Sequence, residues 1–257
     1  INAKSVVFLV FYVDVILLIG NYIIVLSHVN IWLTEQFQMK DLGEASYVLG
    51  IQIIQDRKNK LLALSQATYI DKVLTRFSMQ NSKKGLLPTR HGITLSKAQC
   101  PKTLQEEEHM RRIPYASAVG SLMYAMLCTR PDICYAVGMV SRYQSNPGLD
   151  HWVAVKHILK YLQRTRNYML VYSGGVLNPL GYTDSDFQSD KDSRKSTSGS
   201  IFILGGGAVV WRSIKQSSIA DSTMETDYNA LNDAVNEVVQ MCKFIKELGV
   251  IPSIEGS

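Results

Sequence analysis

The chain has 257 residues, 46% of them hydrophobic and 19% charged, which excludes a disordered polymer and leaves room for one large or two small domains. Its formal net charge of +5 is compatible with a nucleic-acid partner and equally with an ordinary basic globular protein. The four cysteines (Cys100, Cys128, Cys134 and Cys242) form no zinc-ligand cluster, and their scatter is typical of buried thiols in a reducing compartment.

The first apolar run, from Ser5 to Leu26, is about as long as a membrane span. However, Asp14 stands near its middle, no Lys or Arg flanks it as an anchor, and no signal-peptide cleavage site follows it. Val, Ile, Phe and Tyr fill the run, and Gly20-Asn21 interrupts it. This composition favours two strands of a buried sheet, with a membrane helix as the alternative.

The next residues predict short elements. We expect a helix over 29–37, an extended segment over 46–54, a strand over 61–64 and a helix over 66–79. The last of these has a single apolar stripe at helical spacing, formed by Ile70, Val73, Leu74 and Phe77. Residues 83–113 contain prolines, glycines, two basic pairs and an acidic run, and predict a linker or long surface loop.

Three helices should follow: one over 115–128, one starting at Pro131-Asp132, and one over 149–164. Strands are then expected over 168–173, 179–184, 199–204 and 208–213. A long helix should begin near Ser222-Thr223, which are good N-cap residues. Its predicted packing stripe consists of Tyr228, Leu231, Val235, Val238, Cys242 and Ile245.

Carboxylates mark two places where chemistry is conceivable. Asp14 lies inside an apolar hairpin, where it indicates a metal site, an ion pair or simply a tight turn. Asp184 on a strand and Asp227 in the first turns of the long helix can converge on one face of the sheet, and clustered carboxylates suit Mg²⁺ or Mn²⁺. The alternative treats Asp227 as a residue favoured by the helix dipole and makes surface-loop charges of Asp186, Asp190 and Asp192.

Several motifs, taken in order, resemble the polymerase region of copia-type long-terminal-repeat retrotransposons. FYVDVILLIG is similar to the Y-V-D-D hairpin of the reverse-transcriptase palm, and LGI at 49–51 with LSQATYI at 64–70 is similar to the segment from primer grip to thumb. YASAVGSL, TRPDICYA and KHILKYL match the helical region that joins the two enzymes. GYTDSD, RKSTSG and METDYNAL resemble the start of the ribonuclease H domain.

The resemblance implies which residues held metal. Asp14 matches the first aspartate of the hairpin, whereas Val15 stands at the second and cannot ligate a cation. Asp184 matches the first ribonuclease H aspartate, and Asp227 replaces a glutamate. The other palm aspartate and the later C-D-N aspartate of the family are expected to be missing. We therefore expect a catalytically inactive fragment of an RNA-directed DNA polymerase and ribonuclease H.

Nucleic-acid contact is the alternative function, because primer-grip and thumb elements hold duplexes through phosphates. The partner would be an RNA or DNA template-primer or an RNA–DNA hybrid inside the cell, in a cytoplasmic particle or the nucleus, with no membrane involved. Each candidate cation can equally be a solvated surface charge; the candidates are Lys72, Arg76, Lys83, Lys84, Arg194 and Lys195.

Together these observations predict an α+β fold in four parts. Residues 1–82 should form a partial palm, primer grip and thumb-like helix, 83–113 the linker, and 114–166 the helical connection. Residues 167–257 should form a truncated ribonuclease H-like mixed sheet with one long helix.

Overall fold

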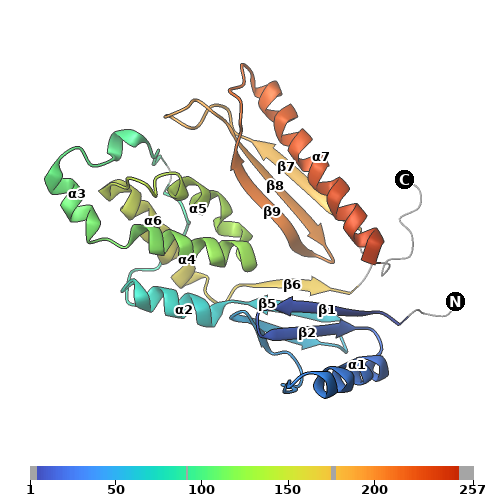
Figure 1. Ribbon diagram of the computed structural model, residues 1–257. Helices are drawn as coiled ribbons and strands as arrows, with labels where there is room; N and C mark the ends of the chain where they lie inside the picture. The colour runs from blue at the N-terminus through green and yellow to red at the C-terminus, as the bar shows by residue number, and fades with distance from the viewer. Residues whose placement is uncertain (1–4, 91, 175–177, 249–257) are drawn as a thin grey trace.

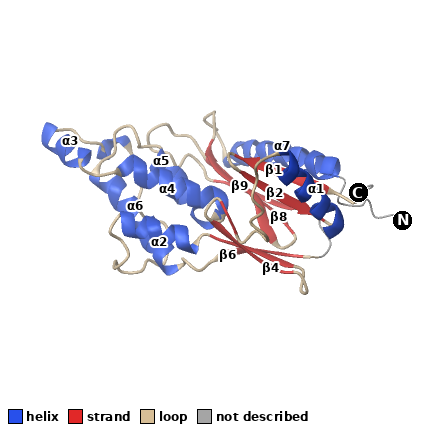
Figure 2. Cartoon of the chain, turned by 60° about the horizontal axis from the view of Figure 1, so that its bottom comes forward, coloured by secondary structure: helices blue, strands red, loops and turns tan. Residues whose placement is uncertain are grey.

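The computed structural model describes residues 5–90, 92–174 and 178–248 and has the expected α+β class. Most helices gather at one end of the molecule, and the strands lie at the other end together with the first and the last helix (Figure 2). The outermost ends of the expected first and last parts, residues 1–4 and 249–257, lie outside the described residues. None of the helices in these ranges is both long and apolar enough to span a membrane.

The N-terminal apolar run forms a hairpin, as expected, but the hairpin is not buried. Strands β1 (Val7–Tyr12) and β2 (Val15–Gly20) pair with each other alone. Helix α1 (Ile23–Gln36) begins six residues earlier than the 29–37 expected, because Ile23 to Leu26 belong to the helix. Two strands and one helix cannot cover both faces of a sheet, and Phe11 stays 67% exposed.

The second sheet joins distant parts of the sequence. Its strand order is β3-β4-β5-β6, and all pairs are antiparallel. The strands are β3 (Tyr47–Val48), β4 (Ile51–Asp56), β5 (Leu61–Ser65) and β6 (Met169–Ser173). The extended segment expected over 46–54 is divided by a turn at Leu49-Gly50, where both residues have positive φ. Strand β6, which we expected in the C-terminal part, thus pairs with β5 and completes a sheet of the N-terminal part (Figure 1).

The expected linker has structure of its own. It contains the short helix η1 (Lys97–Gln99) and α3 (Leu104–Arg111), which starts with a capping box between Thr103 and Glu106. The segment 82–85 lies along α6 (Leu149–Arg164), because the Gly85 amide donates to the Lys160 carbonyl at 2.9 Å.

The hydrophobic core lies between four helices. They are α2 (Ala67–Arg76), α4 (Tyr115–Cys128), α5 (Cys134–Ser141) and α6, and the predicted bounds of α4 and α6 are confirmed. Each helix buries one apolar face, and the most completely enclosed side chains include Val119, Leu122, Val137, Val155 and Leu159.

One buried guanidinium fastens this core. Arg130, just before η2 (Pro131–Ile133), is 1% exposed and donates to both Asp132 oxygens at 2.9 and 2.7 Å. It also donates to the Thr165 carbonyl at 3.2 Å, and Tyr161 donates to Asp132 at 2.8 Å. The end of α6, from which β6 leaves, is therefore held in place by Arg130.

The C-terminal unit is a three-stranded sheet covered by one helix. Strands β7 (Leu180–Ser185), β8 (Thr197–Leu204) and β9 (Gly207–Lys215) are antiparallel, so the mixed sheet that we expected is wrong for the described strands. They follow one another through loops shorter than the crossover that a parallel pair requires. Helix α7 (Thr223–Leu248) lies across β7 and β8 (Figure 1), and the Ser222 hydroxyl caps it as expected.

The predicted packing stripe of α7 is largely wrong. Of its members, Ile245 is buried, whereas Tyr228, Leu231 and Val235 are about half exposed or more. The buried positions are Thr226, Ala230, Ala234 and Ile245. Mostly small side chains of α7 are thus buried, and the larger apolar residues Tyr228, Leu231 and Val235 face outward.

Asp190 anchors the β7–β8 loop to the helical unit. It is 3% exposed and pairs with Arg142, the residue that follows α5, at 3.0 Å and with Lys215 of β9 at 3.2 Å. Burial opposes its charge, yet hydrogen bonds from Ser193 and Lys215 outweigh burial and hold the pKa of Asp190 below its ordinary value. The Trp211 indole adds a bond to the Met126 carbonyl at 3.0 Å.

We predict that Arg130→Lys lowers the free energy of unfolding by about 2–3 kcal/mol, because lysine loses the two-pronged bond to Asp132 inside the core. Urea denaturation followed by circular dichroism measures this change. Arg57→Lys is the matched control, because the Arg57–Glu44 pair is exposed and such pairs contribute less than about 1 kcal/mol. Equal effects of the two substitutions would contradict the role given to Arg130.

Asp190→Asn should cost roughly 2–4 kcal/mol at neutral pH, because it leaves Arg142 and Lys215 without their carboxylate. Because the pKa of Asp190 is lower in the folded protein than in the unfolded chain, the charged carboxylate stabilises the fold at pH values above the unfolded pKa of about 3.9. This stabilisation is lost as the pH falls through the folded-state pKa. The gap between the wild type and this variant should therefore be constant above about pH 5 and shrink below about pH 4. Asp233→Asn, an exposed change on α7, should stay within about 0.5 kcal/mol at neutral pH.

Candidate functional site

Asp14 lies at the tip of the exposed hairpin. Tyr12 pairs with Val15, so Val13 and Asp14 are the two turn residues, and Val13 adopts a positive φ of 47°. The Asp14 side chain is exposed and has no hydrogen bond or ion pair within the described ranges. The structure therefore presents a lone carboxylate at a tight turn, with a valine beside it.

Asp184 lies on the sheet face opposite to α7. The side chains on either side of it point to the helix, because Thr183 donates to the Ala230 carbonyl at 3.3 Å and the Ser185 hydroxyl donates to Asp227 at 2.7 Å. Successive strand residues face opposite sides of a sheet, so Asp184 is directed away from α7. Its Oδ1 accepts the Ser185 amide at 2.9 Å.

Asp227, in contrast, lies on the helix face of the sheet. Ser185 thus donates to both carboxylates, with its backbone amide to Asp184 and with its hydroxyl to Asp227. The structure brings Asp184 and Asp227 to the same end of β7 but presents them from different faces, so the expected convergence on one face is wrong. Side chains alternate between the two faces of a strand, and the sequence spacing alone did not show which face of β7 is turned towards α7.

The other acidic residues of this loop are structural. Asp186 accepts the Thr197 amide at 2.8 Å and the Ser189 hydroxyl at 2.6 Å, and Asp192 accepts the Lys97 amide and the Tyr143 hydroxyl. Asp190 is buried, so the alternative of a surface-loop charge is wrong for it. Across the part of the chain that the structure describes, no group of three His, Cys, Asp or Glu side chains can hold a metal ion. The described residues therefore do not fit the Mg²⁺ or Mn²⁺ site that the resemblance implies.

The candidate phosphate-binding cations fall into two separate places. Lys72 and Arg76 are exposed one helical turn apart on α2, and Lys83 and Lys84 are exposed in the segment that follows. The remaining two belong to the β7–β8 loop and hold it together: Arg194 donates to Gln188 at 3.0 Å, and Lys195 donates to the Ser217 carbonyl.

Further cations that we did not predict lie beside Lys83 and Lys84. Lys156, Lys160 and Arg164 follow at intervals of four residues on α6, the helix that the 82–85 segment contacts. A sequence signal existed for them. No Asp or Glu occurs from Lys72 to Gln105 or from His151 to Thr183, and these stretches carry seven and four Lys or Arg residues.

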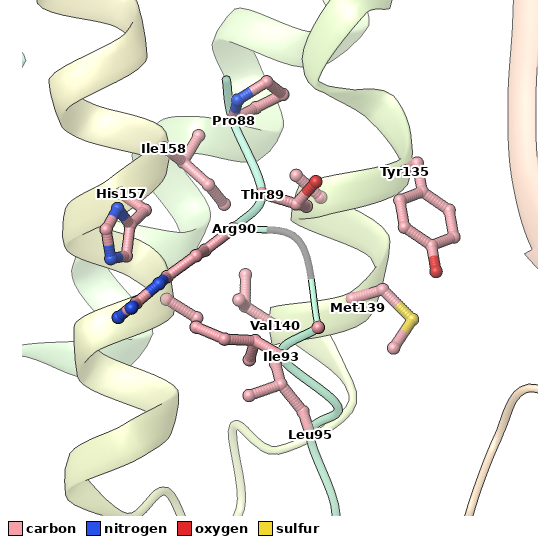
Figure 3. A pocket seen from close by; sticks show the side chains of 13 residues that line it. Pro88, Thr89, Arg90, Ile93, Leu95, Tyr135, Met139, Val140, His157 and Ile158 are labelled. Atoms are coloured by element: carbon pink, nitrogen blue, oxygen red, sulfur yellow. The ribbon is translucent and has the colours of Figure 1, made fainter. Parts of the chain in front are cut away.

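A cavity of about 220 Å³ opens next to these cations (Figure 3). Most of the residues that line it are apolar, and Arg90 and His157 supply nitrogen atoms on the α6 side. The pKa of His157 is lowered by burial first and then by the positive charges of Lys160, Arg90 and Lys156. Cations from the loop and from α6 therefore lie close enough to His157 to act on its charge.

Comparison with known proteins agrees with the motifs. Residues 2–91 match the family model for reverse transcriptase (RNA-dependent DNA polymerase). The chain is 44% identical over 249 residues to the retrovirus-related Pol polyprotein from transposon TNT 1-94 of Nicotiana tabacum, covering 97% of this chain and 19% of that protein. It is 35% identical over 250 residues to the Pol polyprotein from transposon RE1 of Arabidopsis thaliana, covering 97% of this chain and 16% of that protein.

An uncharacterized mitochondrial protein of Arabidopsis thaliana is 34% identical over 227 residues, which is 87% of this chain and 90% of that protein. No solved structure shows significant similarity. The chain spans about a fifth of the length of the tobacco polyprotein. The ordered motifs, the reverse-transcriptase match and these relatives lead to one assignment: the chain belongs to the Pol polyproteins of copia-type retrotransposons, within their reverse-transcriptase region.

Proposed function

We propose that this chain is a non-catalytic segment running from the reverse transcriptase into the ribonuclease H part of such a polyprotein. The observation that supports the proposal is the dispersal of its acidic groups. Metal-assisted phosphoryl transfer in two-metal sites needs ligands gathered around two ions about 3.5–4 Å apart. Asp14 stands alone next to Val15, and Asp184 and Asp227 reach Ser185 from different faces.

The assignment of residues 167–257 to a ribonuclease H part rests on the GYTDSD, RKSTSG and METDYNAL motifs. The three-stranded antiparallel sheet with α7 on one face supports it. Catalysis in that part would need Asp227 to reach the face that carries Asp184, and the Ser185 hydroxyl bond at 2.7 Å holds it on the other face.

A second role, nucleic-acid contact, is favoured by a separate observation. The cations on α2 and in the 83–84 pair are exposed and have no acidic partner in the described part of the chain. Such side chains suit backbone phosphates of a template-primer or hybrid. We place this role inside the cell, in a cytoplasmic particle or the nucleus, as the family implies; the four free, partly buried thiols fit a reducing compartment.

The purified chain with Mg²⁺ or Mn²⁺ should neither extend a primed template nor cut a labelled RNA–DNA hybrid above background. Asp14→Asn and Asp184→Asn are the matched controls, and each should give the same background as the wild type. Metal-dependent extension that Asp14→Asn abolishes, or hybrid cleavage that Asp184→Asn abolishes, would refute the proposal.

A further inference from the structure

We propose that the cationic side of α6, where Arg164 is exposed and Lys156 and Lys160 are partly exposed, forms one surface with the loop beside it and binds the phosphate backbone of a nucleic acid. This surface, the α6 ridge, consists of Lys83, Lys84, Arg90, Lys156, Lys160 and Arg164. The inference rests on the nucleic-acid role proposed above and deepens it by naming the binding surface. Arg194 and Lys195 do not belong to this surface, because they form hydrogen bonds to Gln188 and to the Ser217 carbonyl.

The loop is fixed against the helix by specific bonds. The Gly85 backbone amide donates to the Lys160 carbonyl at 2.9 Å, and the Gln163 side-chain amide donates to the Gln80 backbone carbonyl at 2.6 Å. A Cβ on Gly85 would lie 3.1 Å from both the Lys160 Cβ and the Tyr161 nitrogen, so glycine allows this close approach. Lys83 and Lys84 are therefore held beside Lys160 although 76 residues separate Lys84 from Lys160 in the sequence.

The charge of the ridge is not compensated. From His151 to Arg166 the chain has no Asp or Glu, and the facing stretch from Lys72 to Gln105 has none either. The salt bridges among the described residues use other cations: Arg57, Arg130, Arg142, Arg166, Arg212 and Lys215. Like charges four residues apart destabilise a helix, so Lys156, Lys160 and Arg164 are a cost to α6 that an anionic partner would offset.

Arg90 extends the ridge to the mouth of the cavity. Figure 3 shows its side chain running towards α6 on the side where His157 lies. Burial lowers the pKa of His157 most, and the cations that lower it further come from both the loop and the helix, namely Lys160, Arg90 and Lys156. The two segments thus produce one positive field rather than two isolated charges.

The geometry suits a regular polyanion. Lys156, Lys160 and Arg164 repeat about every 6 Å along the helix axis, and one strand of a duplex carries a phosphate about every 3.4 Å of its axis. An anionic lipid surface is the competing partner, because Leu86 and Leu87 are exposed next to the basic pair. We commit to nucleic acid because the chain belongs to a polymerase family.

The test is fluorescence anisotropy with a labelled duplex and the whole chain, titrated over a series of salt concentrations. The ridge variant is Lys156→Gln, Lys160→Gln and Arg164→Gln together; glutamine keeps helix propensity and most of the aliphatic stem. The matched control is Lys58→Gln, Lys243→Gln and Lys246→Gln, which removes the same charge from exposed positions elsewhere.

The ridge variant should bind at least about tenfold more weakly at low salt, and its salt slope should fall by roughly 2–3, since each lost phosphate contact removes about 0.9. The control should stay within about twofold of the wild type. The double variant Lys83→Gln and Lys84→Gln should weaken binding by a factor between those of the control and the ridge variant. Because both substitutions lie outside α6, a loss of binding in this variant cannot come from a folding defect in that helix.

Equal losses in the ridge and control variants, or an unchanged ridge variant, would overturn the inference. So would wild-type chain that ignores the duplex but binds phosphatidylserine vesicles through the same lysines. These outcomes are independent of catalysis: primer extension or hybrid cleavage refutes the proposed function, whereas loss of ridge-dependent duplex binding refutes only the binding surface.

Discussion

The guanidinium of Arg130 is the interaction on which the arrangement of the chain depends. It is enclosed where α4 ends, where η2 begins and where α6 terminates, and its donors reach Asp132 and the Thr165 carbonyl. A buried guanidinium requires such partners in fixed positions, because an unpaired charge in this place would be strongly destabilising. β6 leaves α6 beside this junction and pairs with β5.

The pairing of β5 with β6 joins the N-terminal sheet to the C-terminal unit. The Ser173 amide donates to the Gly205 carbonyl at 2.7 Å, and the Tyr172 hydroxyl donates to the Ala208 carbonyl at 2.8 Å. Gly207 is required here, because a Cβ would lie 2.6 Å from the Tyr172 ring. On the other side, Asp190 pairs with Arg142, just after α5, and Trp211 donates to the Met126 carbonyl of α4. The C-terminal sheet is thus anchored at both ends of β9.

Local patterns predicted the helices well where one apolar face meets one core. The bounds of α4 and α6 agree with the sequence because their apolar residues recur at helical spacing and are enclosed by neighbouring helices. For α7 the same reasoning chose the wrong residues. Close contact with the sheet favours Ala230 and Ala234, and Tyr228 and Leu231 face outward. Hydrophobicity identified the helix but not its contact face.

The sequence by itself determined the family and the order of most elements, because each depends on residue type and spacing along the chain. Only the tertiary structure decided which groups meet. Strand alternation separated Asp184 from Asp227, and helix packing placed Lys83 and Lys84 beside Lys160. Which side chains become neighbours depends on how whole helices and strands are rotated and packed against one another. Residue spacing along the chain does not specify this packing.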